Sequence, residues 1–244
     1  MRATEKAAAI LILALSAWVI IMMWAATSFQ GHESDRILRV ELSSDAASLK
    51  QAVQSDDSNG VAHNIQMVVR NTYLDFVLIL LYWLTFLSLA VLAGRLGKRL
   101  LAACAGLSIS VAALGNLFEN GAILTAMQVK PFTDQAAVDI STFSQWKWTF
   151  FFLAAIFLGL AIAMNHRVST MRRASGWLFI AGGPFGVLGM ARYRASLDFA
   201  MWMIDIGLLL VAAALLLTLW KLYLSLKELN HFEHIEHAHV HSHA

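Results

Sequence analysis

The chain has 244 residues, of which 59% are hydrophobic and 14% are charged, and its mean hydropathy is +0.63. Soluble domains have about 45–50% apolar and about 25% charged residues, so this composition excludes an ordinary soluble domain and indicates a polytopic membrane protein. The formal net charge of +2 and the lack of a basic stripe interleaved with aromatic residues argue against nucleic acid as a partner. The single cysteine, Cys104, excludes an internal disulfide and a cysteine-based metal cage.

Six apolar segments predict an all-α bundle of six transmembrane helices. Crossing about 30 Å of hydrocarbon takes about 20 helical residues. We expect one helical domain over residues 1–230 with an extracytoplasmic loop over 28–70, followed by a histidine-rich tail over 231–244. The six segments are Ala7–Thr27, Asn71–Gly94, Leu100–Met127, Lys147–Met164, Gly176–Ala191 and Asp198–Trp220.

The first segment is preceded by Arg2 and Lys6, as a secretory signal would be. Its apolar run is longer than the roughly 7–15 residues of a signal, and the stretch MWAATSF lacks a clear small-x-small cleavage site. We therefore interpret this segment as an uncleaved first helix.

The loop over 28–70 contains two further helical patterns. The stretch SSDAASLKQAVQS has a serine and aspartate cap followed by apolar residues at helical spacing, which predicts a short surface helix. Val61, Ile65, Val68 and Val69 form one stripe, so the second span is expected to begin as a longer helix that projects from the membrane. The loop is interpreted as a cap over the helix ends, with a docking surface as the alternative.

The third segment carries polar side chains on one face. Asn116, Glu119 and Asn120 fall at positions i, i+3 and i+4 in the stretch LGNLFENGAIL. The small residues Gly115, Ala112 and Ser108 continue this face, and small residues allow transmembrane helices to approach closely. The face is therefore expected to point into the bundle.

Other ionisable residues are predicted at a similar depth near the extracytoplasmic boundary. They are Asp75, with Tyr82 two turns further along the same face, Lys147 at the start of the fourth segment, and Asp205 in the sixth. A charged carboxylate at the centre of a membrane helix costs about 2.5–3.5 kcal/mol on insertion scales. We therefore expect Asp75 or Glu119 to pair with Lys147, and the remaining carboxylates to be protonated or in contact with water.

The fifth segment is short and has Gly182, Gly183 and Pro184 at its middle. We interpret it as an ordinary helix kinked at its proline, with a broken or re-entrant segment as the alternative. The basic loops GRLGKR and HRVSTMRR predict a cytoplasmic location for both termini. Arg192 and Arg194 would then lie on the opposite side, an exception that a re-entrant fifth segment would remove while placing the C-terminus outside.

The C-terminal tail is rich in imidazole groups, which suit Zn, Ni, Co or Cu ions. A transition-metal site is therefore one hypothesis for it, and an adventitiously metal-binding terminus is the other. The candidate metal ligands are His231, His234, His237, His239, His241 and His243.

Three functions remain open at this point. The first is binding or translocation of a cation, a proton or a small polar solute at Asp75, Asn116, Glu119, Asn120, Lys147 and Asp205. The second is an accessory subunit of a larger membrane complex, in which the same cluster is structural. The third, less favoured, is an enzyme that acts on a lipid or isoprenoid, since no H-E-x-x-H or G-x-S-x-G motif is present. The expected location is a bacterial inner membrane or a plasma membrane, and the expected partners are the lipid bilayer, further copies of the chain or other membrane subunits.

Overall fold

The computed structural model describes residues 7–18, 20, 33–54, 60–95, 97–129, 131–165 and 169–241, without the side chains of 33–35 and 226–241. These ranges contain helices and turns and no strand, which confirms the all-α class. An apolar helix, Ala7–Trp18, comes first. The others are α2 (Glu33–Glu41), α3 (Ala46–Val53), α4 (Gly60–Arg95), α5 (Arg99–Gln128), α6 (Asp134–Ala163), α7 (Thr170–Arg192) and α8 (Leu197–His241).

Five helices are long and apolar enough to cross a membrane, namely α4, α5, α6, α7 and the part of α8 over Leu197–Ser225. This finding indicates a multi-pass membrane protein. The predicted first span is described as a helix only over Ala7–Trp18, and most of the remainder of that segment lies outside the described residues. A sixth span therefore stays a prediction.

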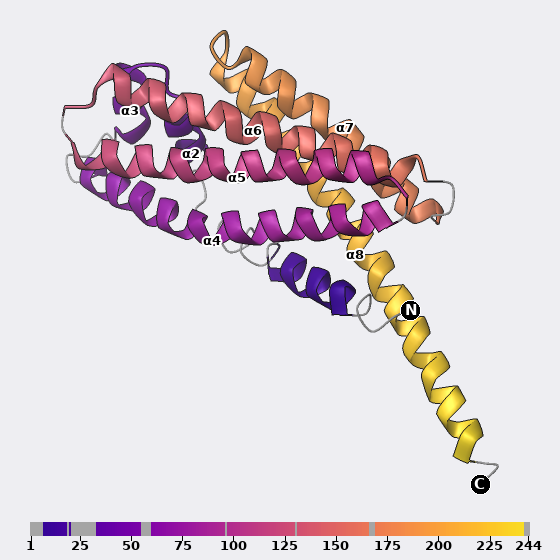
Figure 1. Ribbon diagram of the computed structural model, residues 1–244. Coiled ribbons are helices and arrows are strands. Elements are labelled where there is room, and N and C mark those ends of the chain that lie inside the picture. Colours follow the sequence, from indigo (N-terminus) through magenta and orange to yellow (C-terminus); the bar gives the residue numbers. More distant parts are fainter. Residues whose placement is uncertain are drawn as a thin grey trace.

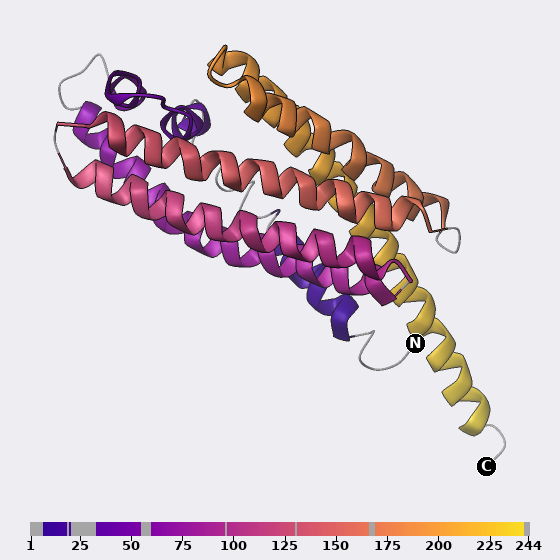
Figure 2. The same cartoon turned by 45° about the horizontal axis from the view of Figure 1, so that its top comes forward.

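The long helices alternate in direction, and each packs on the next one along the chain from α4 to α8 (Figure 1). Helices α2 and α3 cover the end of the bundle where α4 and α6 begin (Figure 2). We call this the capped end; it also holds the α5–α6 and α7–α8 connections. The opposite end, here the basic end, holds Arg95, Lys98, Arg99, Arg172 and Arg173.

The two helical patterns of the 28–70 loop are confirmed. Asp45 caps α3 by accepting the Ser48 backbone N–H at 2.7 Å, and this bond holds the pKa of the Asp45 carboxyl below its usual value. Helix α4 begins at Gly60 and is 36 residues long, so it projects beyond one membrane thickness. Helix α2 was not predicted.

The fifth segment is a continuous helix, which agrees with the favoured interpretation of an ordinary helix that contains a proline and not with a broken segment. Helix α7 runs uninterrupted for 23 residues with Pro184 inside it, and it crosses from the basic end to the capped end (Figure 1). Its glycines serve close packing instead: a Cβ at Gly182 would lie 2.8 Å from the Gly207 carbonyl oxygen on α8. A Cβ at Gly186 would overlap the ring of Phe152 on α6. These contacts hold α7 in the bundle along its length.

The fourth helix also differs from its predicted segment. Helix α6 begins at Asp134, where the Thr133 hydroxyl caps it by accepting the Ala136 N–H at 3.2 Å. Lys147 therefore lies near the middle of the helix rather than at its start. This position carries its side chain into the bundle.

Candidate functional site

Lys147 is the centre of a buried group of charged residues. Its ammonium nitrogen Nζ lies 2.6 Å from Oε2 of Glu119 and 2.8 Å from Oε2 of Glu41. Glu119 is fully buried, and Lys147 is only 6% exposed. Asp75, on the adjacent α4, joins this group through Asn120, the residue after Glu119 on α5, which donates a hydrogen bond to it. We call Glu41, Asp75, Glu119 and Lys147 the carboxylate–lysine cluster.

Neutral side chains hold each carboxylate of the cluster in place. Asn120 donates its side-chain N–H to Oδ2 of Asp75 at 3.0 Å, and the Ser144 hydroxyl donates to Oε1 of Glu119. The indole N–H of Trp148 donates to Oε2 of Glu41 at 3.1 Å. Hydrogen bonds to a carboxylate stabilise its charged form, so they offset part of the cost of burial.

The approach of α5 to α6 depends on a glycine. A Cβ at Gly115 would lie 3.0 Å from the backbone nitrogen of Lys147 and 3.3 Å from the carbonyl oxygen of Phe143. This close approach brings Glu119, one turn further along α5, against Lys147 and Ser144 on α6. The polar face of α5 therefore points into the bundle, as its spacing indicated.

The cluster lies at one depth in the bundle. Arg95 ends α4 and Arg99 begins α5, both at the basic end. The number of residues between Asp75 and Arg95 equals the number between Arg99 and Glu119. At a rise of about 1.5 Å per residue, each carboxylate is about 30 Å from the basic end, which is one hydrocarbon thickness. If the basic end marks one membrane boundary, the cluster lies at the other.

The predicted site residues fall into two groups. Asp75, Asn120, Glu119 and Lys147 come together as described. Asn116 is buried on the same face of α5 as Glu119 and Asn120. Asp205 differs because it is exposed on α8, a helix that packs mainly on α7. Asp205 therefore does not share the buried environment of Glu119, and its role as a ligand stays a prediction.

Sequence reasoning missed two members of the site. Glu41 lies in the loop over 28–70, where a single glutamate gives no signal of burial, yet it is only 9% exposed. Ser144 is fully buried and lies one turn before Lys147 on α6. Its i, i+3 spacing to Lys147 is a signal that could have indicated Ser144, because both residues share a helix face.

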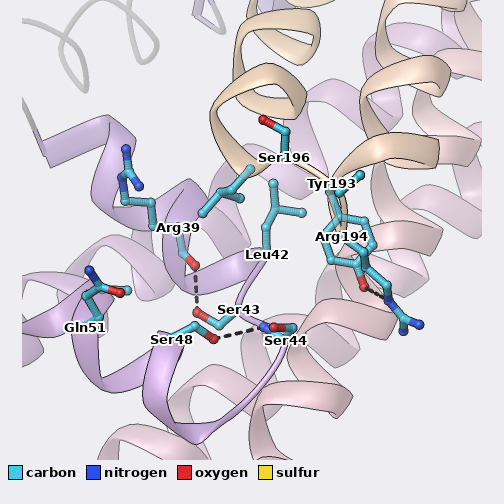
Figure 3. A pocket seen from close by; sticks show the side chains of 12 residues that line it. Arg39, Leu42, Ser43, Ser44, Ser48, Gln51, Tyr193, Arg194 and Ser196 are labelled. Carbon is cyan, nitrogen blue, oxygen red and sulfur yellow. Dashed lines mark hydrogen bonds between the residues drawn. The ribbon is translucent and has the colours of Figure 1, made fainter.

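A pocket of about 450 Å³ opens at the capped end between the α2–α3 turn and the α7–α8 turn (Figure 3). Leu42, which lines it, directly follows Glu41. Tyr193, also in the wall, accepts a hydrogen bond at 2.6 Å from Gln145, which closely precedes Lys147 on α6. The pocket thus lies next to the residues that flank the cluster. Its polar lining consists of Arg39, Ser43, Ser44, Ser48, Gln51, Tyr193, Arg194 and Ser196.

The candidate metal ligands of the histidine tail are not among the side chains that the structure describes. The side chains of His231, His234, His237, His239 and His241 lie outside the described residues, as does His243 entirely. Among the residues that are described, no group of three or more His, Cys, Asp or Glu side chains could hold a metal ion. The transition-metal site stays a prediction.

Comparison with models of protein families, with curated proteins and with solved structures found no match to this chain.

Proposed function

We propose that this protein binds and releases protons at the carboxylate–lysine cluster and couples them to transport across a membrane. The observation that supports this proposal best is the placement of one ammonium group between two buried carboxylates, with a third carboxylate on the adjacent helix. Intramembrane ionisable residues are rare and often mark proton or ion pathways.

The position of Lys147 favours a proton over a metal cation. A metal ion held by Glu41 and Glu119 would occupy the space between their oxygens, and the ammonium of Lys147 fills that space at 2.6 and 2.8 Å. A proton needs no such space, because it adds directly to a carboxylate oxygen. The exchangeable charge that fits this arrangement is therefore a proton.

The net charge of the carboxylate–lysine cluster explains how a bound proton could change the structure. Three ionised carboxylates and one ammonium leave a formal charge of −2, which is costly in a buried site. Protonation of Glu41 would weaken its ion pair with Lys147, which together with the Trp148 hydrogen bond joins α2 to α6. Proton uptake would then loosen the cap beside the 450 Å³ pocket, through which a small polar solute could enter.

The charges of the loops indicate which end of the bundle faces the cytoplasm in this proposal. Lysine and arginine are enriched in cytoplasmic loops, so we place the basic end and the C-terminus in the cytoplasm. The cluster and its pocket would then face the outside of an inner or plasma membrane. Association with further copies of the chain stays open.

Proton flux into liposomes tests the proposal. We expect the purified protein, reconstituted with a pH-sensitive dye inside the vesicles, to carry protons down an imposed gradient. Glu119→Gln should abolish the flux because an amide cannot take up the proton. Asp139→Asn is the matched control, since Asp139 is an exposed carboxylate on the same helix as Lys147. Undiminished flux in Glu119→Gln would exclude the proposed role.

A structural role is the second candidate, and one observation favours it. The contacts of Lys147 join α2, α5 and α6, so the cluster also fixes the relative positions of these helices. An accessory subunit of this kind would carry no protons, and Glu119→Gln would lower its melting temperature in detergent. The unmodified protein should therefore carry protons if the first candidate function is correct and none if the second is correct.

A further inference from the structure

We propose that Trp148 is a positioning residue for the carboxylate–lysine cluster: its side chain holds Glu41 and Lys147 together, and its indole N–H stabilises the ionised carboxylate of Glu41. This part of the inference concerns the geometry of the cluster alone. A second part, which rests on the proposed function, is that Trp148 thereby determines the pH at which the protein takes up protons for transport.

Trp148 contacts both members of one ion pair. Its indole N–H donates to Oε2 of Glu41 at 3.1 Å, and the same oxygen lies 2.8 Å from Nζ of Lys147. The ammonium of Lys147 also lies over the Trp148 ring, 4.7 Å from the ring centre, which is within the range of a cation–π contact. One side chain therefore binds the carboxylate through its N–H and the ammonium through its face.

The Trp148 ring is itself held by aromatic neighbours. It stacks on Phe152, one turn further along α6, with the ring centres 6.1 Å apart and the planes at 25°, and it forms an edge-to-face contact with Phe151. Phe152 is fully buried, and a Cβ at Gly186 on α7 or at Gly207 on α8 would lie 2.0 Å or 2.8 Å from its ring. The packing of α7 and α8 therefore fixes the ring on which Trp148 rests.

The neighbouring Trp146 shows what a tryptophan without this role looks like. Both tryptophans flank Lys147, and tryptophan is enriched at membrane boundaries, where its ring needs no specific partner. Trp146 fits that description, because it is 49% exposed and packs edge-to-face on Phe143. Trp148 is partly buried and contacts two charged groups of the cluster. Anchoring at the membrane boundary does not account for those contacts.

The Trp148 N–H should affect how readily Glu41 takes up a proton. A hydrogen bond donated to a carboxylate favours its ionised form, as the ammonium of Lys147 also does, whereas nearby carboxylates oppose it. Loss of the N–H alone should therefore let Glu41 take up a proton at a higher pH. The other charged groups on this side of the bundle are Glu119 and Asp75 of the cluster, Asp45, which caps α3, and Arg39 of α2, which pairs with Asp198 on α8.

Infrared spectroscopy during a pH titration tests the positioning role. The C=O stretch of a protonated carboxyl group reports Glu41 directly, and its band is the one that Glu41→Gln removes. Trp148→Phe keeps an aromatic ring and removes the N–H, so we expect the midpoint of this band to move up by about one pH unit. Trp146→Phe is the matched control and should leave the midpoint unchanged. An unchanged midpoint in Trp148→Phe, or a Glu41 band that appears at no pH in the unmodified protein, would overturn the inference.

A second variant keeps the test decisive if Trp148→Phe does not fold. A tryptophan analogue with sulfur in place of the indole N–H, incorporated at position 148 alone, keeps the shape of the ring and its stacking on Phe152 while it removes the donor. It should move the midpoint in the same direction as Trp148→Phe. If the analogue leaves the midpoint unchanged, the N–H does not stabilise the ionised Glu41 and the inference is wrong.

Proton flux separates this inference from the proposed function. In liposomes, Trp148→Phe should move the pH of half-maximal flux in the same direction as the infrared midpoint and by a similar amount. An infrared shift without a shift in flux would keep the positioning role and overturn its part in transport. If the unmodified protein carries no protons, the proposed function fails, and the infrared titration still decides whether Trp148 positions Glu41.

Discussion

At the scale of single residues, Lys147 holds the buried charges of the site together. Its ammonium contacts Glu119, which is fully buried, and Glu41, which is 9% exposed. A buried ion pair does not by itself add much stability, because the cost of removing both charges from water offsets their attraction. Removing one partner is different, since the remaining charge stays buried without compensation.

Replacing Lys147 by Met should therefore lower the free energy of unfolding by about 3–5 kcal/mol. The measurement is unfolding in mixed micelles, followed by circular dichroism. Combining Lys147→Met with Glu119→Gln should recover part of the loss, because the uncompensated carboxylate is then neutral. Lys50→Met, at an exposed lysine of α3, should have little effect. Equal effects of the two lysine changes would show that the cluster is not buried as described.

At the scale of helices, glycines determine how closely α6, α7 and α8 pack. A Cβ at Gly159 on α6 would lie 2.6 Å from the Gly176 carbonyl oxygen on α7. A Cβ at Gly189 on α7 would lie 2.9 Å from the Ala200 carbonyl oxygen on α8. Small residues at membrane helix contacts let the backbones approach, so van der Waals contact replaces the hydrophobic driving force that lipid cannot supply.

Replacing Gly159 by Ala should thus destabilise the protein by about 1–3 kcal/mol, because the new methyl group meets backbone that cannot move aside. Gly121→Ala is the control within α5, since nothing lies within 4 Å of its added Cβ. That change should be neutral or stabilising by up to about 1 kcal/mol through helix propensity. Thermal unfolding in detergent measures both, and a stabilising Gly159→Ala would contradict the close crossing of α6 and α7.

At the scale of the whole molecule, the order of the helices places two groups of loops at opposite ends. The α2–α3 turn and the α7–α8 turn lie together at the capped end, where Arg39 forms an ion pair with Asp198 at 3.0 Å. The α4–α5 and α6–α7 connections lie at the basic end. If the bundle crosses the membrane once per helix, the two groups of loops face different compartments.

Single-cysteine labelling in intact cells tests this arrangement. On a Cys104→Ser background, cysteines at the exposed positions Ser44 and Ser196 should both react with a membrane-impermeant thiol reagent. A cysteine at the exposed Ser169, at the basic end, should react only after the membrane is permeabilised. Labelling of Ser44→Cys and Ser196→Cys from opposite sides would contradict the full crossing of α7.

The sequence alone was sufficient to predict the features that depend on local pattern. Apolar runs of about 20 residues predicted the five long helices, because crossing a bilayer depends on length and hydropathy within one segment. The helical period placed Asn116, Glu119 and Asn120 on one face, and that face is buried. The Asp45 cap of α3 was likewise readable from adjacent residues.

Only the tertiary structure decided which side chains meet. Glu41 and Lys147 are far apart in the sequence, and no periodicity connects a loop glutamate with a helical lysine at such a separation. The glycines of α7 fit against Phe152 and Gly207, residues of other helices. The exposure of Asp205 followed from the packing of α8 on α7. Hydropathy and helical period act within one segment, whereas ion pairs and close crossings depend on how segments pack against one another.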